Sequence, residues 1–130
     1  MTEELLNLII GILCVLESGG NPDAVGDGGK AIGILQIHKT MVEEVNRIEG
    51  REKYNLLMRR SPLKSMEMAR IYLRHYEKYP DGGVPDQWYV EYCARIWNGG
   101  PDGYNEKETV KYGRAAVAMY KEYKKWKEQK

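Results

Sequence analysis

The sequence of 130 residues has no phenylalanine and only two cysteines. Its aromatic residues are ten tyrosines and three tryptophans, so a buried ring needs a hydrogen-bond partner and an exposed ring suits a sugar surface. Two cysteines exclude a disulfide framework, and no Cys/His spacing indicates zinc. We expect Cys14 and Cys93 to pack as buried thiols, with a single bridge between them as the alternative. We expect neither a metal nor another cofactor.

The chain also lacks an excess of charge of either sign. Its 20 Lys and Arg residues stand against 19 Asp and Glu residues, which gives a formal net charge of +1. This composition gives no support for nucleic acid as a partner. With 42% hydrophobic and 30% charged residues, the chain is also not of the disordered class.

No hydrophobic run is long enough to span a membrane. The most apolar stretch, residues 5–16, is shorter than a bilayer-spanning helix. Glu3 and Glu4 precede it where a signal peptide needs positive charge, and no small-residue cleavage site follows it. We therefore expect a buried core helix, with no signal peptide and no membrane insertion.

The remaining pattern predicts a mainly α protein with a single domain over residues 1–130. Thr2 suits the N-cap of the first helix, and Pro62 suits the first turn of a later one. The glycine-rich residues 23–37 predict a small irregular lobe or β-hairpin between helices. About five to seven helices are expected, chiefly over residues 2–18, 38–48, 62–79, 86–97 and 106–127.

Two carboxylates lie in contrasting surroundings near the end of the first predicted helix. Glu17 follows Val15 and Leu16, and a carboxyl at the edge of an apolar core has the raised pKa that a general acid needs. Asp27 stands between glycines, where water can reach it. Pairs of carboxylates in different surroundings cleave glycosidic bonds. The alternative is that both residues are structural, Glu17 at a helix end and Asp27 in a turn. Phosphate-loop and calcium-loop spacings are absent from this stretch.

Four segments follow one another in an order typical of one group of enzymes. They are Glu17-Ser18 with Asn21-Pro22 and then Ala-Ile-Gly-Ile-Leu-Gln-Ile at 31–37; the helical stretch 65–73; Ile-Trp-Asn-Gly-Gly-Pro at 96–101; and Glu-Thr-Val-Lys-Tyr at 108–112. Together these segments resemble the lysozyme-like superfamily, specifically goose-type lysozymes and soluble lytic transglycosylase domains. The resemblance covers most of residues 5–120 and implies the lysozyme-like fold.

The resemblance also implies a role for each matching residue. Glu17 corresponds to the catalytic acid that protonates the glycosidic oxygen, and Ser18 to a neighbouring hydrogen-bonding group. Gln36 and Asn98 would hold N-acetyl or hydroxyl groups of the sugar, and Tyr112 would orient Glu17. Trp97 replaces the tyrosine that the group usually has, and its ring would still stack on a sugar. Core packing alone is the alternative for Trp97 and Tyr112.

The reaction type depends on a second carboxylate. Hen-type lysozymes have an aspartate where this chain has Ala31, so a retaining mechanism that uses this position is excluded. Goose-type lysozymes have a Gly-Asp pair that Gly26 and Asp27 match, and a further aspartate where this chain has His38. Lytic transglycosylases of the group lack the Gly-Asp acid and use one glutamate. Asp27 therefore favours hydrolysis, with His38 in a water-positioning or substrate-binding role. The alternative for His38 is a simple surface residue near a turn.

The resemblance implies a muramidase that cleaves the β-1,4 bond between N-acetylmuramic acid and N-acetylglucosamine in peptidoglycan, or that acts on a related GlcNAc-containing polysaccharide. The alternatives are a lytic transglycosylase that forms 1,6-anhydro products with Glu17 alone, and a non-catalytic glycan-binding module. We expect a monomer that reaches the cell wall after release, or within a larger or phage-encoded system. The lysine-rich end, residues 121–130, is either a solvated helix face or a contact with an anionic wall polymer.

Overall fold

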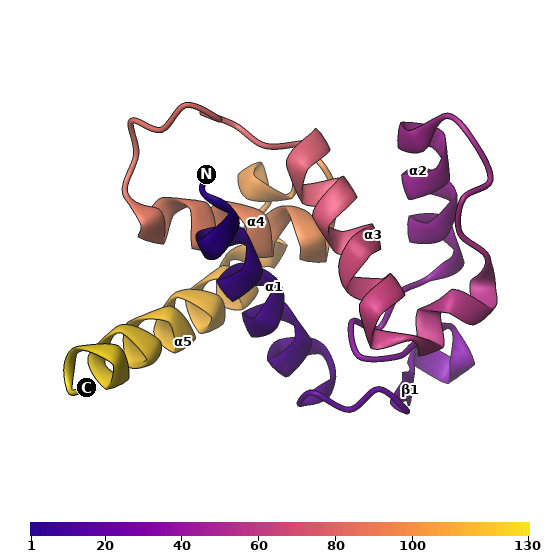
Figure 1. Cartoon of the computed structure of the whole chain (residues 1–130), viewed down its shortest axis with the longest axis horizontal. Helices are drawn as coiled ribbons and strands as arrows, with labels where there is room; N and C mark the ends of the chain where they lie inside the picture. The colour runs from indigo at the N-terminus through magenta and orange to yellow at the C-terminus, as the bar shows by residue number, and fades with distance from the viewer. The chain divides into compact units, whose positions relative to one another are not determined.

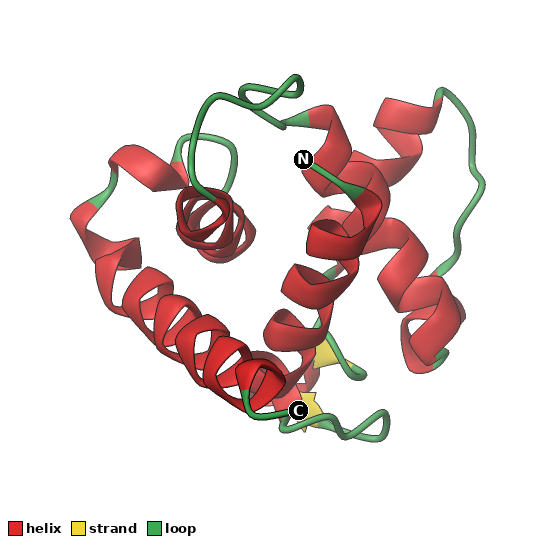
Figure 2. Ribbon diagram, turned by 60° about the vertical axis from the view of Figure 1, so that its left-hand side comes forward, coloured by secondary structure: helices red, strands yellow, loops and turns green.

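A computed structural model describes all 130 residues and is 68% helical. It contains five α-helices and one small antiparallel sheet of two strands (Figure 2). The predicted class, mainly α with a small irregular lobe, is therefore confirmed, and it is the class that the lysozyme-like resemblance implies. The chain comprises two compact units, one of residues 1–12 with 77–130 and the other of residues 13–76.

The first helix, α1 (Glu3–Ser18), is built as the sequence predicts. The Thr2 hydroxyl accepts a hydrogen bond from the Leu5 N–H at 3.1 Å, which satisfies one of the free N–H groups at the helix start. Leu6 and Leu13 are fully buried, whereas Val15 is 49% exposed. No helix of the chain is both long and apolar enough to cross a membrane.

In the unit of residues 13–76, the lobe consists of β1 (Val25–Gly26), a 3-10 turn at Asp27–Gly29 and β2 (Ala31–Ile32). It is followed by α2 (Lys39–Glu49), a 3-10 helix at Leu56–Arg60 and α3 (Pro62–His75). Helices α2 and α3 lie side by side (Figure 1). The sequence pattern predicts no element over the stretch that forms this 3-10 helix.

Helix α3 ends four residues earlier than predicted, because Tyr76 leaves the helical conformation. The Tyr76 hydroxyl donates to the Glu44 carboxylate on α2, and its ring meets that of His75 edge-on at 4.6 Å. The long-range bond to Glu44 stops the helix before the Pro80 signal is reached. The prediction that the helix runs to residue 79 was wrong.

The other unit is dominated by α4 (Asp86–Gly99) and α5 (Val110–Glu128), which pack against each other. Helix α5 begins at Val110 rather than at 106, after 3-10 turns at Gly103–Asn105 and Lys107–Thr109. The buried Thr109 hydroxyl bonds to the carbonyls of Gly103 and Glu106. A side chain that bonds to the nearby backbone competes with helix formation, so the expected earlier start was wrong.

The two cysteines are free and buried, as predicted. Cys14 belongs to the unit of residues 13–76 and Cys93 to the other unit. Burial raises the pKa of the Cys14 thiol to about 11, so this side chain remains a neutral apolar group at physiological pH. The thiols therefore act as core residues.

Candidate active site

Glu17 occupies the last turn of α1 and is half-buried. The residue after it, Ser18, fastens the end of the helix to the lobe. Its hydroxyl lies 2.7 Å from the Ile34 carbonyl and 3.2 Å from the Cys14 carbonyl, and it accepts from the Asn21 N–H at 3.0 Å. Ser18 therefore holds in place the end of the helix that carries Glu17.

Gln36 holds the lobe together from within. Its side-chain amide donates to the carbonyls of Ala24 at 3.1 Å and Gly33 at 3.0 Å. Both N–H bonds of the amide are then used by the backbone, and only Oε1 remains to accept. A Cβ at Gly26 would lie 2.3 Å from that oxygen. A substrate contact by Gln36, as the resemblance implies, is therefore limited to its carbonyl oxygen.

A second set of side-chain hydrogen bonds connects the lobe to the 3-10 helix that precedes α3. The Arg59 guanidinium donates to the carbonyls of Lys30 at 3.2 Å and Ile37 at 3.1 Å. A Cβ at Gly33 would come within 2.0 Å of the Arg59 carbonyl oxygen, and the Gly33 backbone has φ +87°. Both observations require glycine at this position. The lobe is thus held from two sides and presents residues 26–30 at its tip.

Asp27 and His38 are brought together by this lobe. The Asp27 carboxylate lies 3.2 Å from Nε2 of His38, with side-chain exposures of 66% and 42%. Asp27 has the left-handed backbone conformation, φ 51°, which is uncommon for a residue with a side chain. His38 stands immediately before α2 as its N-cap residue. The pair thus places a solvent-accessible carboxylate within ion-pair distance of an imidazole.

The remaining predicted residues belong to the other compact unit. Trp97 and Asn98 lie on the last turns of α4, the ring half-buried and the amide exposed. Tyr112 lies on the first turn of α5 and is half-buried. Partial exposure of the Trp97 and Tyr112 rings argues against a role in core packing alone.

Arg95 is a positioning residue that the sequence analysis did not single out. Although only 9% exposed, its guanidinium donates to the Thr109 hydroxyl at 2.8 Å, the Glu91 carboxylate at 3.1 Å and the Glu106 carbonyl at 3.0 Å. These bonds connect the end of α4, which carries Trp97, to the start of α5, which carries Tyr112. The signal in the sequence is the one basic residue of this helix, which stands four residues after Glu91.

Across the described chain, no group of three His, Cys, Asp or Glu side chains could hold a metal ion. Carboxylates of this kind can perform acid–base chemistry, and amides and aromatic rings can hold a polar polymer.

Comparison with known proteins identifies the family of the chain. The sequence matches the family model of the transglycosylase SLT domain over residues 2–129. Searches of curated proteins and of solved structures found no match. Because the matched region is almost the entire sequence, the chain belongs to the transglycosylase SLT domain family, whose lysozyme-like enzymes act on peptidoglycan.

Proposed function

We propose that the chain is a muramidase that hydrolyses the β-1,4 bond between N-acetylmuramic acid and N-acetylglucosamine. In this proposal Glu17 is the general acid, and Asp27 is the base that activates water. The observation that carries the choice of hydrolysis is the contact of 3.2 Å between Asp27 and His38. An enzyme that uses a single glutamate has no need of a second, oriented carboxylate.

The position of Glu17 supports its role as the acid. It is half-buried on the last turn of α1, and the C-terminal end of a helix carries partial negative charge. As the general acid it would donate its proton to the leaving oxygen of the glycosidic bond. The Ser18 bond to the Ile34 carbonyl holds the helix end rigid, so the donor stays in position relative to the lobe.

Asp27 suits the role of base because it is exposed to water. Its side chain is 66% exposed, so a water molecule can reach the carboxylate. The His38 imidazole lies 3.2 Å from the carboxylate, and in this proposal it takes the place of the second aspartate of goose-type enzymes. An inverting hydrolase needs such a separate base on the opposite side of the sugar from the acid.

Three further residues are proposed to contact the substrate. Trp97 would stack on a sugar ring, Asn98 would bond to N-acetyl or hydroxyl groups, and Tyr112 would contribute a hydroxyl. Their support is the partial or full exposure of all three side chains and the Arg95 bonds that hold their helix ends together.

A lytic transglycosylase is the second candidate, and the family match favours it. In that reaction the 6-hydroxyl of the N-acetylmuramic acid attacks its own anomeric carbon and forms a 1,6-anhydro ring. Glu17 alone would then first donate and later accept a proton. Asp27 would be only a turn residue in this case.

Substitution of the two carboxylates tests the proposal. Glu17→Gln should lower the rate of peptidoglycan solubilisation by about 10²-fold or more, because it removes the acid. Asp27→Asn should lower the rate by about 10²-fold while binding is kept, because it removes the base. Asp23→Asn is the matched control, since Asp23 is an exposed carboxylate of the same lobe, and it should act as wild type.

Each outcome has a distinct meaning. If Glu17→Gln kept activity within a few-fold of wild type, the assigned acid would be wrong. If only Asp27→Asn were silent, the transglycosylase reaction would replace hydrolysis. Circular dichroism of each variant checks that a loss of rate does not come from a loss of fold.

A further inference from the structure

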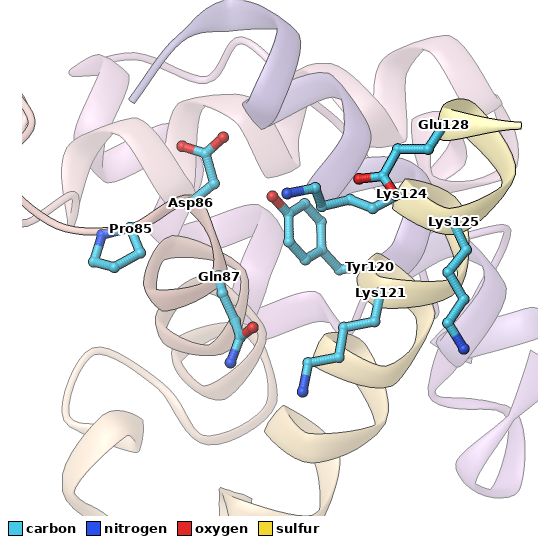
Figure 3. Close-up of a pocket in the computed structure, with 8 residues that line it drawn as sticks. All are labelled: Pro85, Asp86, Gln87, Tyr120, Lys121, Lys124, Lys125 and Glu128. Atoms are coloured by element: carbon cyan, nitrogen blue, oxygen red, sulfur yellow. The ribbon is translucent and has the colours of Figure 1, made fainter. Parts of the chain in front are cut away.

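The unit of residues 1–12 and 77–130 contains a groove between the start of α4 and the last turns of α5 (Figure 3). We call it the α4–α5 groove. Its volume is about 520 Å³. Asp86 and Gln87 line it from α4, and Tyr120, Lys121, Lys124 and Lys125 line it from α5. None of these residues has a part in the reaction proposed above.

Three lysines make the α5 side of this groove positively charged. Lys121, Lys124 and Lys125 are exposed, and they fall within about one turn of a helix. The Lys124 ammonium lies 5.8 Å from the centre of the Tyr120 ring. Lys125 is 3.7 Å from Glu122, with both side chains more than two-thirds exposed, and such a surface pair is weak. A ligand carboxylate can therefore replace Glu122 at small cost.

Negative and neutral polar groups complete the lining. Asp86 lies on the α4 side, and Glu128 lies at the end of α5 (Figure 3). The three lysines and these two carboxylates leave one net positive charge. A strand of evenly spaced phosphates would be repelled by both carboxylates. A peptide that carries carboxylates, an amino group and amide bonds matches the mixture, because the Gln87 amide can both donate and accept.

The floor of the groove is firm and partly apolar. Tyr120 is only 7% exposed, so its ring is held by the packing of α5 on α4. A Cβ at Gly113 would lie 2.8 Å from the Arg95 side chain, which shows how closely the two helices approach. Pro85 adds a rigid apolar surface on the α4 side. A groove between two packed helices is formed before the ligand arrives, which lowers the entropic cost of binding.

We propose that the α4–α5 groove binds the peptide side chains of peptidoglycan. This inference rests on the proposed function, because it takes peptidoglycan as the substrate. Carboxylates of the peptide would meet Lys121, Lys124 and Lys125, its amides would meet Gln87, and its amino group would meet Asp86 or Glu128. The groove would select peptide-bearing strands over bare glycan, independently of the residues that break the bond.

The test is a titration of the ¹⁵N-labelled full chain with the free peptide, released from purified peptidoglycan by an amidase. We expect shifts at Gln87, Tyr120 and Lys124 that diminish as salt is added, because exposed charges are screened. The double variant Lys121→Gln/Lys125→Gln should bind the peptide about fivefold more weakly, on the scale of two exposed ion pairs. The control Lys107→Gln/Lys127→Gln removes the same charge outside the groove and should bind as wild type.

Other outcomes overturn the inference. Equal binding by the double variant and the control would contradict it, as would a peptide titration that leaves the groove residues unshifted. A parallel titration with polyglycerol phosphate that shifts these residues more strongly than the peptide would assign the groove to a phosphate polymer instead. These readouts involve no turnover. If the groove did not bind the peptide but the chain hydrolysed peptidoglycan, the proposed function would stand without this inference. If the groove bound the peptide but the chain did not hydrolyse peptidoglycan, the inference would stand without the proposed function.

Discussion

At the scale of single residues, the site depends on what each polar side chain is already bonded to. Ser18 and Gln36 match the family motif, yet both bond to backbone carbonyls of the lobe. Asp27 and His38 lie 3.2 Å apart at the surface. The residues that shape the lobe and the residues proposed to meet the substrate are thus largely different ones.

Trp97 provides a prediction on substrate binding. Trp97→Ala should weaken the binding of chitooligosaccharides by about 1–3 kcal/mol, taking the scale of aromatic stacking on nucleic-acid bases. Tryptophan fluorescence of the wild type should change on the same titration. Unchanged affinity in the variant would assign the ring to packing, and Trp126→Ala is the control, since Trp126 is 53% exposed at the far end of α5.

Cys14 provides a prediction on the pH dependence of stability. Burial raises the pKa of its thiol from 9.0 to about 11, so the unfolded chain loses this proton at a lower pH than the folded one. The stabilising contribution is complete below pH 9 and is lost as the pH rises towards 11. Between these limits the free energy of unfolding of wild type should fall more steeply than that of Cys14→Ala. Parallel urea-unfolding curves at pH 8 and pH 10.5 measure the difference, and equal slopes would contradict the burial argument.

At the scale of elements, the boundaries set by local rules could be read from the sequence. Thr2 and Pro62 mark the starts of α1 and α3 in this way. The early end of α3 depends on Tyr76 meeting Glu44, and the late start of α5 depends on the Thr109 hydroxyl bonding to the carbonyls of Gly103 and Glu106. Side-chain contacts of this kind have no periodic signature, so the sequence pattern could not predict them.

The lobe provides a prediction at this scale. Gly33→Ala should destabilise the chain by about 2–4 kcal/mol, because it combines a left-handed backbone with a clash against the Arg59 carbonyl. The control is Gly28→Ala, where φ is also positive (+64°) but nothing lies within 4 Å of the new Cβ, at a cost of about 1–2 kcal/mol. Thermal unfolding of both variants separates the two effects. Equal destabilisation of the two variants would show that the close approach of Gly33 to the Arg59 carbonyl does not contribute to stability.

At the scale of the whole molecule, the fold class, the family and Glu17 as a candidate acid were accessible from the sequence. The class follows from periodicity, and the family from four ordered motifs that the family match then supports. The contact between Asp27 and His38, and the role of Arg95, required coordinates. Both depend on loop conformation and burial, as in the positive φ of Asp27, and motif spacing does not encode them.

The mass of the products released from purified peptidoglycan tests the central claim most directly. A hydrolase adds one water molecule to each bond that it breaks, so the account predicts muropeptides with reducing N-acetylmuramic acid ends. If Asp27 activates that water, the inverted anomer should form first. Products lighter by one water molecule carry 1,6-anhydro ends, and they would contradict the account in favour of a lytic transglycosylase with Glu17 alone.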